Sequence, residues 1–176
     1  MSQSSLHEKK ALSAAIEMEE MGFSFFKDSA AKAKDSFAKE VFEFLAGEEL
    51  NHIKAIEKFH ESYMTGHPGD SAKLIKDIQD NSAISAIRHL FDQLSDKRPI
   101  TGTDMDVYIF AMDFERKGEA FYTKAEADAV DPNAKKLFGF LVGEERRHFK
   151  ILESCQAYFE NPAEFFHQRE KWHLEG

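Results

Sequence analysis

Apolar residues recur every three or four positions along most of the chain, as Val41, Phe44 and Leu45 illustrate. This spacing places apolar side chains on one face of an α-helix, and no sustained alternation argues for strands. Only four prolines and nine glycines interrupt the pattern. The sequence therefore predicts an all-α protein. We expect helices at about 6–33, 37–64, 71–95, 104–129, 132–160 and, shorter, 162–173.

Local residue choices support several of these boundaries. An Asx residue before proline is typical of a helix start, because it caps the first turn and proline suits the first helical position. The stretch from Gly66 to Asp70 is rich in glycine and proline and predicts a loop. The predicted helix starts are Asp131-Pro132, Asn161-Pro162 with Glu164 completing a capping box, and Thr103 with Asp106.

An internal repeat organises the chain. A shift of 96 positions aligns residues 15–57 with 111–153 without a gap, and 18 of the 43 aligned positions are identical. The sequence therefore predicts a single domain over 1–176, built from a duplicated helical hairpin at about 6–64 and 104–160. A crossover at about 65–103, with a helix of its own, is long enough for the one-crossover topology of a four-helix bundle.

Composition narrows the functional classes. The 23 basic and 32 acidic residues give a net charge of −9, which argues against nucleic-acid and anionic-membrane partners. Cys155 is the only cysteine, so an internal disulfide, a zinc ribbon and a four-cysteine iron site are excluded, and we expect this thiol to be buried. The chain has no membrane-length apolar run, and its start resembles no signal peptide. We expect a cytoplasmic protein.

The repeat carries candidate metal ligands. Each half has one glutamate on its first helix and a Glu-x-x-His motif on its second, which presents a carboxylate and an imidazole on one helix face. Four carboxylates and two neutral imidazoles carry a charge of −4, which two divalent ions cancel. Such a set suits iron or manganese better than zinc. The candidates are Glu19, Glu49, His52, Glu115, Glu145 and His148.

A solvent-exposed acidic face is the alternative interpretation of a single Glu-x-x-His motif. Two observations favour metal binding. Both copies keep Glu and His while the intervening pair changes from Leu-Asn to Arg-Arg. Leu45, Glu49, His52 and Ile56 also share one side of a helix, so the motif interrupts an apolar stripe, where unpaired carboxylates are costly. The sequence assigns no role to Glu17, Glu48, Glu57 or Glu144, and the remaining six histidines are expected at the surface.

The doubled pattern A-x-x-x-E-x-x-G-x-x-F-[FY] and F-L-x-G-E-E-x-x-H resembles the ferritin-like superfamily and, within it, the rubrerythrin family. The resemblance implies that the six candidates bind two iron ions, with manganese or zinc as substitutes. It implies a di-iron oxidoreductase that reduces hydrogen peroxide or dioxygen. Because full-length rubrerythrins carry a four-cysteine rubredoxin module that this chain lacks, an external donor, such as a rubredoxin-like protein, would supply electrons. We also expect a homodimer.

The sequence departs from the family at one position. Rubrerythrins carry a further glutamate one turn after the third-helix ligand, where this chain has Gly118, and Glu119 is one residue out of phase. Tyr122, two turns after Glu115, is expected to hydrogen-bond a ligand carboxylate or a bridging oxygen species; a plain core aromatic is the alternative. Two other functions stay open: iron oxidation and storage as in ferritins, and a bundle whose metal is structural or absent.

Overall fold

The computed structural model describes residues 3–65, 71–82, 84–94 and 105–167, and these ranges contain helices and no strand. The predicted all-α class is therefore confirmed. The helices are α1 (Gln3–Lys32), α2 (Ser36–Met64), α3 (Ser71–Asn81), α4 (Ile84–Asp92), α5 (Met105–Asp128) and α6 (Pro132–Glu160). Residues 162–167 are also helical, and the rest of the helix predicted at 162–173 lies outside the described residues.

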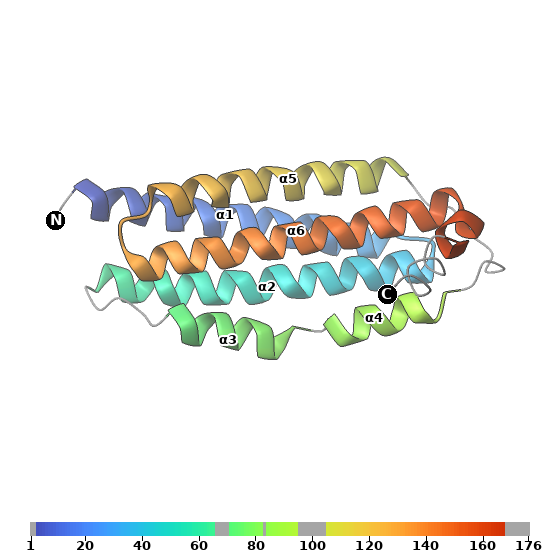
Figure 1. Cartoon of the computed structure of the whole chain (residues 1–176), viewed down its shortest axis with the longest axis horizontal. Helices are drawn as coiled ribbons and strands as arrows, with labels where there is room; N and C mark the ends of the chain where they lie inside the picture. The colour runs from blue at the N-terminus through green and yellow to red at the C-terminus, as the bar shows by residue number, and fades with distance from the viewer. Residues whose placement is uncertain (1–2, 66–70, 83, 95–104, 168–176) are drawn as a thin grey trace.

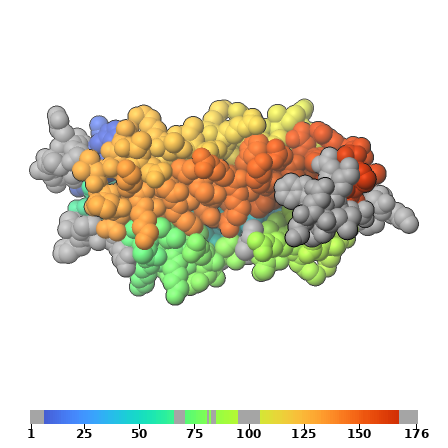
Figure 2. All heavy atoms as spheres, viewed as in Figure 1, coloured from blue at the N-terminus to red at the C-terminus, as the bar shows by residue number. Residues whose placement is uncertain are grey.

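Four long helices form a ferritin-like bundle. α1 packs against α2 and α5 packs against α6, so the two halves of the repeat are two helical hairpins. α3 and α4 follow one another along the outside of α2, and α3 also contacts α6 (Figure 1). Figure 2 shows the face of the molecule on which α6 is bordered by α3 and α4. The predicted duplicated hairpin with a helical crossover is confirmed.

The caps of the hairpins repeat as the sequence does. Asp35 and Asp131, 96 positions apart, are the N-caps of α2 and α6, and each side chain accepts hydrogen bonds from two backbone N–H groups of the first turn. The Asn161 side chain accepts from the backbone N–H of Glu164 at 3.2 Å, as the capping pattern predicts. Thr103, the other predicted cap, lies outside the described residues.

The crossover differs from its prediction. A single helix at 71–95 is wrong, because the chain leaves the helix after Asn81 and begins α4 at Ile84. Ser82 lies at this break, and its hydroxyl donates to Glu48 of α2 at 2.7 Å. Serine side chains compete with the helix for backbone hydrogen bonds, so Ser82 is a poor residue for continuing a helix.

Two apolar clusters fill the bundle, one on each side of its middle. Along α1, Leu12 and Ala15 belong to one cluster, and Phe26 and Ala30 belong to the other. Glu19 lies between them. On α2, α5 and α6 the candidate ligands likewise lie between members of the two clusters. Cys155 is fully buried in the cluster with Phe26, as predicted. Among the described residues, no helix combines the length and apolar character needed to cross a membrane.

Candidate metal centre

The structure brings the six predicted ligands together at the middle of the bundle. They come from four helices: Glu19 from α1, Glu49 and His52 from α2, Glu115 from α5, and Glu145 and His148 from α6. Each is at most 2% exposed. This placement follows from the helical period, because these residues occupy the inward stripe that apolar residues hold above and below them.

The donor atoms converge in two groups. One oxygen or nitrogen from each of Glu19, Glu49, His52 and Glu145 lies within 4.8 Å of the others, and the same holds for Glu49, Glu115 and His148. Glu49 therefore belongs to both groups. The geometry provides two adjoining positions that share a carboxylate, as a dinuclear site requires.

The imidazoles face these carboxylates. His52 Nδ1 lies 3.2 Å from Glu19 Oε2 and 3.7 Å from Glu49 Oε2. His148 Nδ1 lies 3.0 Å from Glu49 Oε1 and 3.6 Å from Glu115 Oε2. The two rings stack with their centroids 5.5 Å apart and their planes 14° apart. Each histidine thus directs the same nitrogen toward the centre.

The residues present fit a pair of divalent ions. Buried polar groups normally have hydrogen-bond partners, yet both carboxylate oxygens of Glu115 and Oε1 of Glu145 have none among the described residues. Four buried carboxylates at close range also repel one another. Cations at the centre would satisfy these oxygens and cancel the charge, and oxygen donors with some nitrogen suit iron or manganese.

The centre's electrostatics favour bound protons where no cation is present. Burial raises the pKa of Glu19 and Glu115 well above the usual value, and the charge of Glu49 raises both further. Burial and the Glu115 charge likewise raise the pKa of Glu145. These three carboxyls would therefore hold protons at a pH where exposed glutamates are ionised.

The pKa values of Glu49 and of the two histidines shift in the direction opposite to the effect of burial. Burial would raise the pKa of Glu49, but its close contacts with Glu19, His148 and His52 lower this pKa well below the usual value. Burial would lower the pKa of His52, but the Glu19 charge and carboxylate contacts raise it well above the usual value. The pKa of His148 is raised against burial by its contact with Glu49. The shared carboxylate is the one that stays ionised.

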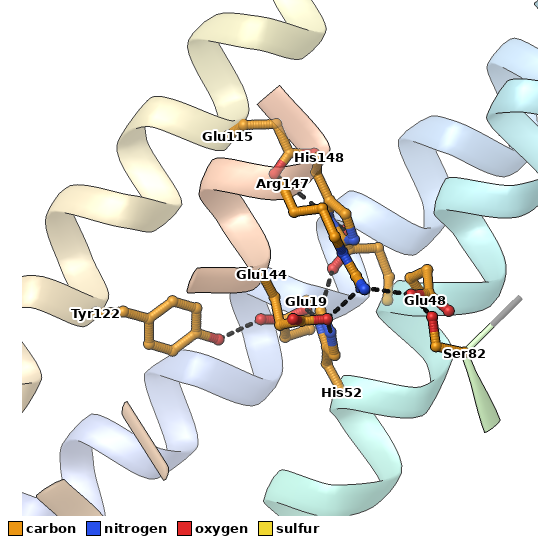
Figure 3. Close-up of polar contacts among 10 residues, drawn as sticks. Glu19, Glu48, His52, Ser82, Glu115, Tyr122, Glu144, Arg147 and His148 are labelled. Atoms are coloured by element: carbon orange, nitrogen blue, oxygen red, sulfur yellow. Dashed lines mark hydrogen bonds and ion pairs between the residues drawn. The ribbon is translucent and has the colours of Figure 1, made fainter. Parts of the chain in front are cut away.

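Tyr122 hydrogen-bonds one of the carboxylates that the sequence predicts as ligands. The side chain is fully buried on α5, and its hydroxyl donates a hydrogen bond to Glu19 Oε1 (Figure 3). Burial and the Glu19 charge raise the pKa of this phenol well above its usual value, so it stays a donor. The ring stacks on Phe138, with centroids 6.2 Å apart.

A second layer of polar side chains surrounds the centre, and the sequence analysis missed it. This outer layer consists of Glu48, Ser82, Glu144 and Arg147. The Arg147 guanidinium lies between the two carboxylates and donates to Glu144 and, at 2.6 Å, to Glu48 Oε2 (Figure 3). Glu144 Oε2 in turn lies 3.6 Å from His52 Nε2. The signal in the sequence is the Gly-Glu-Glu triplet that both repeats keep.

Positions 118 and 119 explain the departure from the family pattern. Glu119 pairs with the exposed Arg146 at 2.6 Å and is absent from the buried donor groups. Gly118 instead leaves room for Glu145: a Cβ at position 118 would meet Glu145 Cδ at 2.9 Å. The space next to the third-helix ligand thus holds a carboxylate from α6.

This combination of fold and site defines a class of protein. A four-helix bundle with carboxylates and imidazoles at its middle is a ferritin-like protein. The chain matches the family model described as Rubrerythrin over residues 10–156, most of its 176 residues. It therefore belongs to the rubrerythrin family. Searches of curated proteins and of solved structures return no significant match.

Proposed function

We propose that this protein binds two iron ions and reduces hydrogen peroxide or dioxygen with electrons from an external donor. The observation that carries the proposal is the buried set of four carboxylates and two imidazoles, several of whose atoms lack partners in the protein. The proposed ligands are Glu19, Glu49, His52, Glu115, Glu145 and His148, and manganese is the alternative metal. Membership of the rubrerythrin family supports iron.

The protein's own residues would hold the ions, orient the ligands and keep bulk water out. A pair of ferrous ions supplies Lewis acidity and two electrons. Glu49 belongs to both donor groups, which suits it to lie between the ions. Tyr122 orients the Glu19 carboxylate, and the apolar clusters on either side shield the site from water.

The overall reaction with peroxide consumes two electrons and two protons and yields two molecules of water. Electrons would come from a separate redox protein, such as one of the rubredoxin type. The two protons would come from outside the six ligands, because Glu19, Glu115 and Glu145 must be deprotonated when they hold the ions.

The first experiment is metal analysis of protein purified without oxygen, followed by reduction and rapid mixing with peroxide or dioxygen in separate runs. We expect two iron ions per chain and faster reoxidation by peroxide, followed by absorbance. Faster reaction with dioxygen and several irons consumed per site would indicate iron oxidation and storage instead. Zinc in the purified protein with no redox response would indicate a structural metal.

A further inference from the structure

The two halves of the centre share their ligands but differ in what supports those ligands. The 96-residue repeat places Glu19 opposite Glu115 and His52 opposite His148. We name the half with Glu19 and His52 the first half-site, and the half with Glu115 and His148 the second half-site. If the residues around the ligands were repeated as the ligands are, the two half-sites would bind an ion equally well.

The carboxylate on the hairpin's first helix is fixed in only one half-site. Tyr122 donates to Glu19, whereas neither oxygen of Glu115 accepts a hydrogen bond from the described residues. The repeat explains the difference, because the counterpart of Tyr122 is Phe26. The two rings are placed alike: Tyr122 stacks on Phe138 at 6.2 Å and 28°, and Phe26 stacks on Phe42, the counterpart of Phe138, at 6.3 Å and 22°.

The histidine is likewise backed by a carboxylate in only one half-site. Neither His52 Nε2 nor His148 Nε2 makes a hydrogen bond among the described residues, but Glu144 Oε2 lies within ion-pair distance of His52 Nε2, at 3.6 Å, whereas the ion pairs of His148 are made by Nδ1. The counterpart of Glu144 is Glu48, and Glu48 is held elsewhere by Arg147 and by Ser82 of the crossover. The crossover has no counterpart in the repeat, so it breaks the symmetry of the outer layer.

The donor atoms show the same bias. The group of donor atoms that includes His52 has four residues within 4.8 Å of one another, but the group that includes His148 has three. A preorganised set of ligands binds more tightly, because less freedom is lost on binding. A carboxylate behind a ligating histidine fixes its tautomer and raises its basicity, and outer partners of this kind change metal affinity about 10- to 100-fold.

We propose that the two metal positions are inequivalent, and that the first half-site fills first and holds its ion more tightly. Tyr122 and Glu144 are its positioning residues. This inference rests on the proposed function, because it assumes that the six residues bind metal. It implies that the ion of the second half-site exchanges more readily.

The test is stepwise addition of Co²⁺ to metal-free protein, followed by visible absorbance and calorimetry. We expect two steps whose dissociation constants differ by about tenfold or more. Replacement His52→Gln should remove the tighter step and His148→Gln the weaker one. Equal steps in the wild type, or loss of the tighter step in His148→Gln, would overturn the inference. Failure to take up Co²⁺, Fe²⁺ or Mn²⁺ would contradict the proposed function itself.

Two matched substitutions exchange the supports between the halves. Tyr122→Phe removes the hydroxyl and should weaken the tighter step by about tenfold, while the weaker step changes little. Phe26→Tyr gives the second half-site a phenol at the equivalent place and should tighten the weaker step. The double variant should reverse the order of filling. If both single variants leave the two steps unchanged, the tyrosine does not set the order and the inference fails in that part.

The outer layer needs its own variants. Glu144→Gln keeps the side-chain shape but removes the charge behind His52, so it should weaken the tighter step. Arg146→Asn is the control, because the Arg146 side chain is exposed and its ion pair is with Glu119, not with a side chain of the outer layer. Its two steps should equal those of the wild type. A tighter step unchanged in Glu144→Gln would remove Glu144 from the explanation.

Discussion

At the scale of single residues, the two repeats differ at a few positions in and around the centre. Tyr122 and Arg147 stand where the first repeat has Phe26 and Asn51, and each contacts an acidic side chain at the centre or beside it. Glycine is equally informative, because Gly118 lets the Glu145 carboxylate lie against the α5 backbone. A small residue is therefore part of the site without binding anything.

We predict that Gly118→Ala weakens metal binding by about tenfold without unfolding the apo protein. The added Cβ would meet Glu145 Cδ at 2.9 Å, so the carboxylate must move away from its place in the centre. Alanine favours the helix by about 1 kcal/mol over glycine, which opposes any loss of apo stability. Mn²⁺ binding by calorimetry and the apo melting temperature measure the two effects.

The control is Gly143→Ala on α6, where an added Cβ meets nothing within 4 Å. This variant should keep the wild-type Mn²⁺ affinity and gain up to about 1 kcal/mol of stability from helix propensity. The Mn²⁺ affinity of Gly22→Ala should lie between those of the other two variants. Its added Cβ would lie 3.0 Å from Phe114 and 3.4 Å from Glu49 Cδ. Unchanged Mn²⁺ affinity in Gly118→Ala would show that Glu145 tolerates the methyl group or is not a ligand.

At the scale of elements, local sequence accounts for the hairpins better than for the crossover. The caps at Asp35 and Asp131 and the 3.6-residue period are properties of short stretches, and they predicted α1, α2, α5 and α6 to within a few residues. At the break in the crossover, Ser82 donates a hydrogen bond to Glu48, which is 34 residues away. A pattern read along one helix contains no information about such a contact.

One buried side chain joins three of these elements. Glu8 of α1 accepts hydrogen bonds from the Val130 and Asp131 backbone N–H groups at 2.7 Å each, and from the Tyr63 hydroxyl at the end of α2. Burial would raise the pKa of Glu8, but these three hydrogen bonds lower it overall. A carboxylate with a lowered pKa stabilises the fold above its unfolded-state pKa, and this contribution is lost as the pH falls.

We predict that Glu8→Gln lowers the free energy of unfolding by about 2 kcal/mol at pH 7, because hydrogen bonds to a charged group are replaced by weaker ones. The loss should shrink as the pH falls from 4.5, the ordinary glutamate pKa, through the lowered pKa of Glu8 in the folded protein, where the wild-type carboxylate also becomes neutral. Urea unfolding at several pH values measures this. Glu20→Gln, at an exposed position of the same helix, should show neither effect.

At the scale of the whole molecule, the bundle holds a highly charged centre between two apolar clusters. The six inward residues could be predicted because the duplication repeats them and because they interrupt an apolar stripe. Arg147 and Ser82 could not, because the repeat does not keep them and their roles depend on how the crossover packs over α2 and α6. The sequence thus indicated which residues meet at the centre, but not the outer-layer contacts that differ between its two halves.

The metal-free centre should make stability depend on pH in a specific direction. The pKa of Glu19, Glu115 and Glu145 is raised above the ordinary value of 4.5, and that of His52 above 6.5. The folded apo protein therefore binds more protons than the unfolded chain, so its stability falls as the pH rises from 4.5 through these raised values. Metal requires the deprotonated ligands, so its affinity rises over the same range.

We predict that the melting-temperature difference between Fe²⁺-loaded and apo protein, measured without oxygen, grows as the pH rises from about 5 to 7. At a hundredfold excess over the dissociation constant, metal adds about 2.7 kcal/mol of stability. The double variant Glu19→Gln/Glu115→Gln replaces two buried carboxyl groups at nearly constant shape. Its apo form should be at least as stable as wild-type apo protein at pH 7, yet gain little from Fe²⁺.

The control is Glu17→Gln/Asp113→Asn, which neutralises two exposed acidic residues that are counterparts in the repeat. Its melting temperature should rise on Fe²⁺ binding as much as that of the wild type. If the Glu19/Glu115 variant gains as much from Fe²⁺ as the control, these two glutamates are not ligands.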